Sequence, residues 1–267
     1  MERYGVFGNP IAHSLSPVIH AQFAKQTGLD ISYDKILAPV DGFSSSAHSF
    51  INQGAKGFNI TVPFKIEAFN LATQLSLNAK TAGAVNTIKV DGDELLGENT
   101  DGIGLVNDLV NNLDISLKNK VVLILGAGGA TRGILLPLLK QSPERLMIAN
   151  RTASRAIQLA KDFSDYGKTC GFSLEKVKHD PVDIIINATS ASLDGQMPNI
   201  ANGVANGAIC YDLMYGEQTP FMNWAKANNA KMVMDGLGML VEQAAAAFKF
   251  WTEKQPNTQA VIKHLRS

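Results

Sequence analysis

Apolar and polar residues alternate along the first hundred positions in the two periods that distinguish strands from helices. Residues 4–8, 31–38 and 57–62 form short apolar or alternating stretches of strand length. Helical patterns lie between them, and strands joined by helical crossovers pair in parallel. We therefore expect a largely parallel sheet in this half of the chain.

One connection in this half differs from the others. Residues 85–90 and 94–97 flank Asp91-Gly92-Asp93, a sequence typical of a β-hairpin turn. We expect this turn to place Val90 opposite Glu94. The predicted sheet is therefore mixed, with one antiparallel hairpin.

The first helix has clear sequence signals at both ends. Ser16 is expected as its N-cap, Pro17 occupies the first helical position, and Gly28 ends it.

From about residue 101 the alternation becomes more regular. Val121–Leu125 is a continuous apolar run, as in a strand buried on both faces of a parallel sheet, and a helix follows to about Leu139. Further strands are expected at residues 146–150, 183–188, 208–213 and 231–234. This order predicts a doubly wound, Rossmann-like dinucleotide-binding fold.

Two helices close the chain, at residues 240–253 and 259–265, without a further strand to pair with. We expect them to return to the first domain and make it discontinuous. The predicted fold class is α/β with two domains: a mixed, mostly parallel sheet domain at residues 1–101 plus 237–267, and a doubly wound domain at residues 102–236.

Composition excludes several classes of protein. The 267 residues include 24 basic and 24 acidic side chains and are 45% hydrophobic, whereas disordered chains and nucleic-acid binders carry a large net charge. No apolar run approaches the roughly 20 residues of a membrane span, and the N-terminus shows no secretion signal. Cys170, Cys210 and the scattered histidines form no metal-binding pattern. We expect a cytoplasmic protein with no metal, nucleic-acid or membrane partner.

A glycine-rich turn follows the strand Val121–Leu125. Gly126, Gly128 and Gly129 allow backbone N–H groups to approach a pyrophosphate, and the helix after them adds its positive dipole end. The sixth position of the usual dinucleotide pattern is Thr131 rather than Gly or Ala. A tight strand-to-helix turn without a ligand is the alternative at this point.

The end of the next strand favours NADP over NAD. NAD-binding proteins normally place a carboxylate there, against the ribose 2′-hydroxyl, but this chain has Asn150-Arg151-Thr152, with Arg155 one turn later. Guanidinium groups match the oxygens of a 2′-phosphate, which a carboxylate would repel. Alternatively, both arginines are solvated residues at a helix start.

Polar residues also gather near the ends of strands in the first half. Alternation places Asn59 and Thr61 on one face of their strand, and Lys65 follows beyond its carboxyl end, where open α/β sheets bind ligands. Taken singly, Lys65 also fits a solvated surface lysine, and Asn59 and Thr61 fit an outer sheet face.

The hairpin adds Asn86, which falls opposite about Glu98 and thus at the same end as Asp101. A helix N-cap role would by itself explain Asp101. Capping likewise explains Ser16, whereas Ser14 has no such structural duty. A further candidate is Gln243, an amide in a mostly apolar helix, which needs a partner or a wet surface.

Taken in order, these motifs resemble the shikimate dehydrogenase family over essentially the whole chain. The matching segments are Ser14-Leu-Ser16-Pro17, Asn59-Ile-Thr61-Val62-Pro63-Phe-Lys65, Ala84-Val-Asn86-Thr87, Asn99-Thr-Asp101-Gly102, Gly126-Ala-Gly-Gly-Ala130, Asn150-Arg-Thr152, Asn187-Ala-Thr-Ser190, Asp212-Leu-Met-Tyr215, Asp235-Gly236 and Gln243-Ala-Ala.

The resemblance implies reversible hydride transfer between NADPH and 3-dehydroshikimate, giving shikimate, on the pathway to chorismate and the aromatic amino acids. It also implies an active site between the domains, in a monomer or homodimer. Lys65 and Asp101 match the catalytic pair. Matches to substrate-binding positions are Ser14, Ser16, Asn59, Thr61, Lys65, Asn86, Asp101, Tyr215 and Gln243. Expected cofactor-binding residues are Gly126, Ala127, Gly128, Gly129, Ala130, Asn150, Arg151, Thr152, Arg155, Thr189, Met214 and Gly236.

Two other functions fit parts of the pattern. A quinate/shikimate dehydrogenase would accept quinate and often use NAD, against which Asn150-Arg151-Thr152 argues. A non-catalytic sensor of a cyclohexene acid would need neither the Lys–Asp pair nor the glycine turn, and this chain has both.

Overall fold

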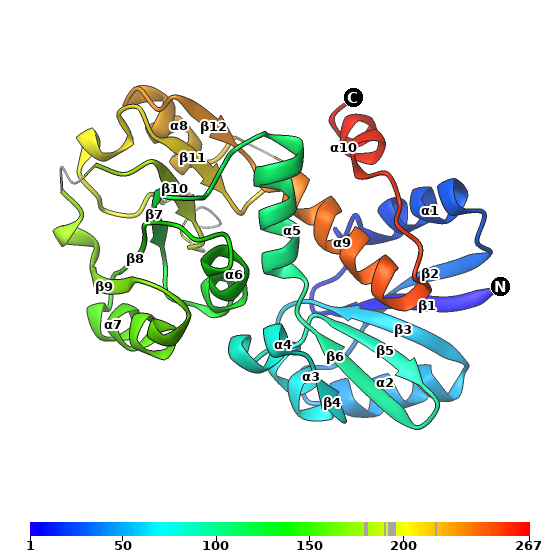
Figure 1. Cartoon of the computed structure of the whole chain (residues 1–267). Helices are drawn as coiled ribbons and strands as arrows, with labels where there is room; N and C mark the ends of the chain where they lie inside the picture. The colour runs from blue at the N-terminus through cyan, green and yellow to red at the C-terminus, as the bar shows by residue number, and fades with distance from the viewer. Residues whose placement is uncertain (179–180, 190, 192–195, 217) are drawn as a thin grey trace. The chain divides into compact units, whose positions relative to one another are not determined.

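The computed structural model describes residues 1–178, 181–189, 191, 196–216 and 218–267. Ser190 of the motifs above lies outside the described residues. The chain forms two compact units, Met1–Leu105 with Leu240–Ser267, and Val106–Met239 (Figure 1). The units divide a few residues after the boundaries expected from the sequence.

The first unit contains a mixed sheet of six strands in the order β2-β1-β3-β5-β6-β4. Its strands are β1 (Glu2–Gly8), β2 (Ile31–Leu37), β3 (Ala55–Ile60), β4 (Gln74–Leu75), β5 (Thr87–Asp91) and β6 (Glu94–Glu98). β1 pairs in parallel with both β2 and β3, whereas β5 runs antiparallel to β3 and β6. The predicted combination of parallel strands with one hairpin is confirmed.

Helices cover this sheet, and the two closing helices belong to the same unit. The helices are α1 (Ser16–Thr27), α2 (Phe43–Asn52), α3 (Lys65–Leu71), α4 (Leu77–Ala82), α5 (Asp101–Asn107), α9 (Leu237–Thr252) and α10 (Thr258–Arg266). Phe23 of α1, Phe248 of α9 and Val261 of α10 are fully buried in one apolar cluster. Trp251 of α9 donates from Nε1 to the Ile88 carbonyl at 2.9 Å. The predicted return of the C-terminal helices to the first part of the chain is confirmed.

The second unit is a parallel sheet in the order β12-β11-β10-β7-β8-β9. Its strands are β7 (Val121–Leu125), β8 (Arg145–Asn150), β9 (Thr169–Ser173), β10 (Ile184–Asn187), β11 (Ile209–Asp212) and β12 (Met232–Met234). Its helices include a π-helical turn at Asp108–Asn112, α6 (Gly129–Leu139), α7 (Ala153–Asp162) and α8 (Pro220–Ala227). β7 lies at the centre, and the chain winds outward from it in both directions. This is the doubly wound, Rossmann-like order that the sequence predicts.

Strand β9 was not predicted from the sequence. Its sequence, Thr-Cys-Gly-Phe-Ser, has no continuous apolar run, and it lies at the sheet edge beside β8. A Cβ at Gly171 would lie 2.2 Å from the Ala156 carbonyl oxygen of α7. The glycine that weakens the strand signal is therefore what allows α7 to pack against this edge.

Two local expectations were wrong by one position. The hairpin pairs Val90 with Leu95 and Thr87 with Glu98, because its turn has two residues rather than three and Gly92 adopts a φ of +61°. Helix α1 begins at Ser16 itself, and the preceding residue, Leu15, provides no side-chain cap. Gly28 does end this helix, in the left-handed conformation.

Among the described residues, no helix combines the length and the apolar character that crossing a membrane requires.

Candidate functional site

Lys65 and Asp101 form an ion pair in the first unit. The Nζ–Oδ2 distance is 2.6 Å, and the two side chains are 28% and 8% exposed. Lys65 begins α3, whose start is anchored by the buried ring of Phe64 stacked on Phe43 at 5.1 Å. The structure thus places an ammonium that solvent can reach against a buried carboxylate.

A helix N-cap precedes the first helical residue, but α5 begins at Asp101 itself. Asp101 is therefore not the N-cap that the alternative explanation required. Its backbone N–H donates to Asn99 Oδ1 at 3.2 Å. Its carboxylate oxygens are divided between Lys65 and Asn86, whose Nδ2 lies 2.8 Å from Oδ1. The side chain is therefore committed to this polar cluster rather than to capping.

Asn86 connects the ion pair to two other elements. Its Nδ2 also donates to Thr100 Oγ1 at 3.0 Å and to Gln243 Oε1 of α9 at 3.3 Å. Its Oδ1 accepts from the Thr100 backbone N–H and from the Thr87 hydroxyl, both at 2.9 Å. Gln243 thus has the amide partner that its apolar surroundings require.

Asn59 is held by three groups. Its Oδ1 accepts from the Tyr33 hydroxyl at 2.7 Å. Its Nδ2 donates to Thr87 Oγ1 at 3.0 Å and to the Asn86 carbonyl at 3.3 Å. Thr61 lies beyond the end of β3, which is two residues shorter than expected at this end, and its backbone N–H donates to the Phe7 carbonyl.

The structural roles expected of the two serines are reversed. Ser14 Oγ accepts from the Ser16 backbone N–H at 3.3 Å, so Ser14 has the local bonding duty at the start of α1. Ser16 makes no capping bond. Tyr33 contacts one of the predicted substrate-binding residues, Asn59.

A buried histidine packs against the ring of Tyr33. The rings of His20 and Tyr33 stack at a centroid distance of 4.2 Å and an angle of 8°. Neither nitrogen of His20 has a hydrogen-bond partner among the described residues. Burial lowers the pKa of His20 to about 3, although the nearby Asn59 side chain acts in the opposite direction. His20 is therefore neutral. The spacing of the histidines in the sequence indicated no metal site and predicted no other role for His20.

In the second unit, the glycine turn joins β7 to α6. Gly126 adopts a φ of +105°, and a Cβ built on Gly128 or Gly129 would meet no atom within 4 Å. Thr131, at the sixth position of the pattern, is buried and donates from Oγ1 to the Gly126 carbonyl at 2.9 Å. The threonine therefore closes the turn from within and leaves its outer side open, where Ala127 is half-buried and Ala130 is exposed.

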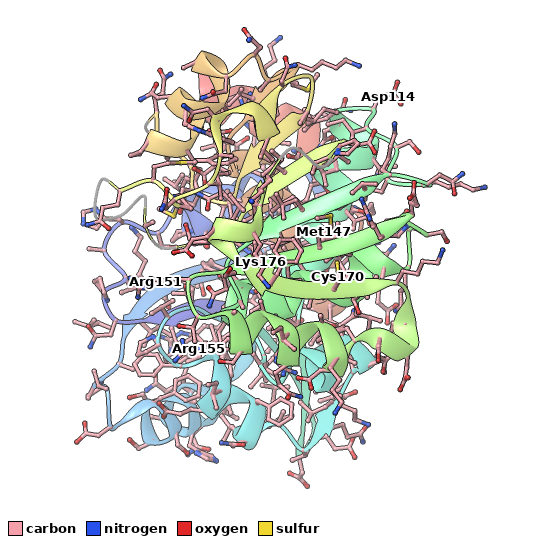
Figure 2. The ribbon with its side chains drawn as sticks, turned by 90° about the vertical axis from the view of Figure 1, so that its left-hand side faces the viewer. Asp114, Met147, Arg151, Arg155, Cys170 and Lys176 are labelled. Atoms are coloured by element: carbon pink, nitrogen blue, oxygen red, sulfur yellow. The ribbon has the colours of Figure 1, made fainter. Side chains whose placement is uncertain are left out.

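The end of β8 presents the two expected arginines. Asn150 Nδ2 donates to the Thr152 carbonyl at 3.0 Å and shapes the turn into α7. Arg151, Thr152 and Arg155 are exposed, and neither arginine forms an ion pair with a described carboxylate. Figure 2 shows both arginines at this end of the unit, where β8 passes into α7.

A buried polar pair organises the loops after β10 and β11. Asn187 and Asp212 face each other in register, are both inaccessible to solvent, and bond through Nδ2 and Oδ1 at 3.1 Å. Asn187 Oδ1 accepts from the hydroxyl of Thr189 at 2.8 Å, and Asp212 Oδ1 accepts from the Met214 backbone N–H at 3.2 Å. Thr189 and Met214, which are predicted to bind the cofactor, are thus held by two residues that were not predicted to have a role at the site.

Gly236 lies against the same loop. Its backbone N–H donates to the Met214 carbonyl at 2.8 Å, and a Cβ at this position would lie 2.3 Å from the Leu213 carbonyl oxygen. Tyr215, expected near the substrate, belongs to this second unit and is 37% exposed. Burial of part of its ring raises the pKa of its hydroxyl.

These residues fit a dinucleotide with a 2′-phosphate. The turn offers open space beside exposed glycines at the start of an eleven-residue helix, as a pyrophosphate requires. The neighbouring strand end offers guanidinium groups and no carboxylate in the segment Asn150-Arg151-Thr152. Among the described residues, no group of three or more metal-ligating side chains is present.

Comparison with known proteins gives consistent matches along the chain. Residues 6–88 match the family profile described as the shikimate dehydrogenase substrate binding domain. Residues 108–195 match the profile of shikimate/quinate 5-dehydrogenase. Residues 236–266 match the profile of the shikimate 5′-dehydrogenase C-terminal domain. A shikimate dehydrogenase (NADP(+)) from Ruthia magnifica subsp. Calyptogena magnifica is 70% identical over 100% of both chains.

Solved structures agree with this. An Ael1 enzyme from Pseudomonas putida is 42% identical, covers 99% of this chain and 98% of its own, and has a TM-score of 0.96. Shikimate 5-dehydrogenase from Thermus thermophilus, in complex with NADP(H) and shikimate, is 32% identical, covers 100% of this chain and 99% of its own, and has a TM-score of 0.88.

Proposed function

The chain belongs to the shikimate dehydrogenase family, and on that premise we propose that it catalyses the reversible, NADPH-dependent reduction of 3-dehydroshikimate to shikimate. The product leads to chorismate and the aromatic amino acids. The observation that carries the proposal is the Lys65–Asp101 ion pair, set among neutral hydrogen-bonding side chains. A sensor would need no such pair.

Lys65 provides the proton in this proposal. Bound NADPH supplies the hydride. As the substrate ketone is reduced, its oxygen gains negative charge, and the Lys65 ammonium stabilises that charge and donates the proton. Such positioned proton transfer contributes about 10²–10⁴-fold to rate.

Asp101 holds the Lys65 ammonium in place and presents an acceptor to a neighbouring substrate hydroxyl. Because Asn86 donates to the other carboxylate oxygen, Asp101 keeps one orientation when substrate is exchanged. A carboxylate that is 8% exposed needs such compensation, because burying an unpaired charge is costly.

The remaining predicted residues bind the rest of the substrate. Ser14 and Ser16 supply hydroxyl donors for its carboxylate, and Asn59, Thr61, Asn86 and Gln243 supply amides and a hydroxyl for its ring oxygens. Tyr215 would supply a further hydroxyl.

The second unit would hold the cofactor. Gly126, Ala127, Gly128, Gly129 and Ala130 receive the pyrophosphate, and Asn150, Arg151, Thr152 and Arg155 receive the ribose phosphate. Thr189, Met214 and Gly236 would lie beside the nicotinamide end. A cytoplasmic location and a monomeric or homodimeric state remain predictions.

A direct assay tests this function. Purified protein is incubated with shikimate or quinate, and with NADP or NAD, and the absorbance of the reduced nicotinamide is followed. We expect rapid turnover with shikimate and NADP. Comparable turnover with quinate and NAD would support the quinate/shikimate dehydrogenase alternative, and no turnover with any pair would contradict the enzyme proposal.

A further inference from the structure

A chain of hydrogen bonds links β2 to the Lys65–Asp101 pair within the first unit. It runs from the Tyr33 hydroxyl to Asn59 Oδ1 at 2.7 Å, and from Asn59 Nδ2 to Thr87 Oγ1 at 3.0 Å. It continues from the Thr87 hydroxyl to Asn86 Oδ1 at 2.9 Å, and from Asn86 Nδ2 to Asp101 Oδ1 at 2.8 Å. Tyr33 and Thr87 were not among the residues expected at the site.

The direction of this chain is fixed at the end nearest Asp101. The backbone N–H of Thr100 can only donate, and it lies 2.9 Å from Asn86 Oδ1. The carboxylate of Asp101 accepts from the other side of the same amide. Asn86 therefore has a single orientation, with its oxygen toward Thr87.

The remaining orientations follow from that one. Because Asn86 presents an oxygen, the single proton of the Thr87 hydroxyl is used there. Thr87 Oγ1 then accepts from Asn59, so Asn59 must turn its nitrogen toward Thr87 and its oxygen toward Tyr33. Tyr33 in turn must donate.

The orientation of Asn59 determines what it can offer a ligand. Both hydrogens of Nδ2 are directed to protein acceptors, Thr87 Oγ1 and the Asn86 carbonyl. Oδ1 has two lone pairs and Tyr33 uses one of them. Asn59 can therefore meet a substrate hydroxyl as an acceptor, and Tyr33 is the group that anchors this oxygen.

We propose that Tyr33 is a positioning residue for the substrate, which anchors the amide oxygen of Asn59. The proposal rests on the proposed function, because its readout is turnover of shikimate. Tyr33 is suited to this role because burial raises the pKa of its hydroxyl, which keeps it protonated. Its ring is held by the stacked, neutral ring of His20.

The test is Tyr33→Phe, which retains the ring against His20 and removes the hydroxyl. We expect the KM for shikimate to rise about five- to tenfold, which corresponds to one neutral hydrogen bond. The kcat should fall less than about threefold, because Asn86 and Lys65 keep their own contacts to Asp101. The KM for NADP should stay unchanged.

Tyr4→Phe is the matched control. Tyr4 is another tyrosine of the first sheet, more buried than Tyr33, and it stacks on Trp251 at 4.9 Å. Its hydroxyl donates to Glu2, outside the chain of hydrogen bonds. Its removal should leave the KM for shikimate unchanged. An unchanged KM for shikimate in Tyr33→Phe, or equal rises for shikimate and NADP, would overturn the proposal.

Thr87→Val provides a second test that does not depend on folding of the Tyr33 variant. It breaks the same chain at its middle with a side chain of similar shape, and the KM for shikimate should again rise about five- to tenfold. The double variant should have about the KM of the worse single variant, because each change loosens the same Asn59 amide. Multiplied effects, or a wild-type KM in Thr87→Val, would contradict a single chain. If the wild type turns over shikimate and the variants have the same KM for shikimate, the positioning role of Tyr33 is contradicted and the proposed function is not.

Discussion

Lys65 Nζ lies 2.6 Å from Asp101 Oδ2, although 36 positions separate the two residues in the chain. One residue begins α3 and the other begins α5. The contact therefore depends on the strand pairing of the first sheet rather than on any local spacing. Removing either partner leaves the other charge without compensation, so the pair can be tested through both rate and binding.

Lys65→Ala should lower kcat by about 10²–10⁴-fold, the usual contribution of a positioned proton donor. The KM for shikimate should change far less, because the main interaction of Lys65 is made as charge develops on the substrate oxygen. Steady-state kinetics at saturating NADP measure both. Lys56→Ala, at an exposed position of β3, is the control, and a near wild-type kcat in Lys65→Ala would refute the assignment.

Arg151→Ala should weaken NADP binding by at least about tenfold, because a guanidinium–phosphate pair is a charge-assisted contact. Binding of NAD, which has no 2′-phosphate, should barely change. Titration calorimetry with each cofactor gives both values. Lys226→Ala removes an exposed cation of α8 in the same unit and should affect neither. Equal losses for NADP and NAD in Arg151→Ala would mean that other residues bind the 2′-phosphate.

His20→Phe should alter the pH dependence of stability. The pKa of His20 is about 3 in the folded protein because the ring is buried, whereas its ordinary value is 6.5. Between these values the unfolded chain binds a proton that the folded chain does not. The free energy of unfolding of the wild type therefore falls with decreasing pH below 6.5, by up to about 1.4 kcal/mol per pH unit.

The phenylalanine ring can keep the stack on Tyr33 but has no group to protonate. The free energy of unfolding of His20→Phe should therefore lose this contribution and decline less steeply below pH 6.5. Urea unfolding at several pH values gives the slope of the free energy of unfolding against pH for each protein. The difference between the two slopes should approach the value that corresponds to one bound proton. Parallel pH profiles for the two proteins would show that His20 does not stay neutral on folding.

Gly236→Ala should lower the free energy of unfolding by about 1–3 kcal/mol, the usual cost of forcing an extra carbon into a packed site. The new Cβ would collide with the Leu213 carbonyl and displace the loop that carries Met214, so NADP binding should weaken too. Gly128→Ala is the matched comparison, because its Cβ meets no atom within 4 Å. That variant should weaken NADP binding without loss of stability. Equal stabilities of the two variants would contradict the packing argument.

The sequence was most informative where the signal was local. The strand Val121–Leu125 and the end of the following helix at Leu139 were predicted at their true positions, because a fully buried strand is apolar throughout and a glycine turn separates it from the helix. The hairpin register was missed by one residue, since Asp91-Gly92-Asp93 admits turns of two lengths. An edge strand such as Thr169–Ser173 gave no apolar run to detect.

The polar cluster was only partly predictable for a similar reason. Lys65 and Asp101 stand out as chemistry-bearing residues in recognisable motifs. Tyr33 and Thr87 do not, because their importance arises from partners on neighbouring strands. Ser14 and Ser16 exchanged their expected duties because the first helical residue depends on the backbone angles of Leu15, which no residue pattern specifies.

The closing helices also have a consequence for biosynthesis. Trp251 and the buried faces of α9 and α10 complete the core of the unit that starts the chain. Translation runs from the N-terminus, so residues 106–239 are synthesised before those helices. The unit that is begun first therefore cannot bury its apolar core until those helices have been made and have emerged.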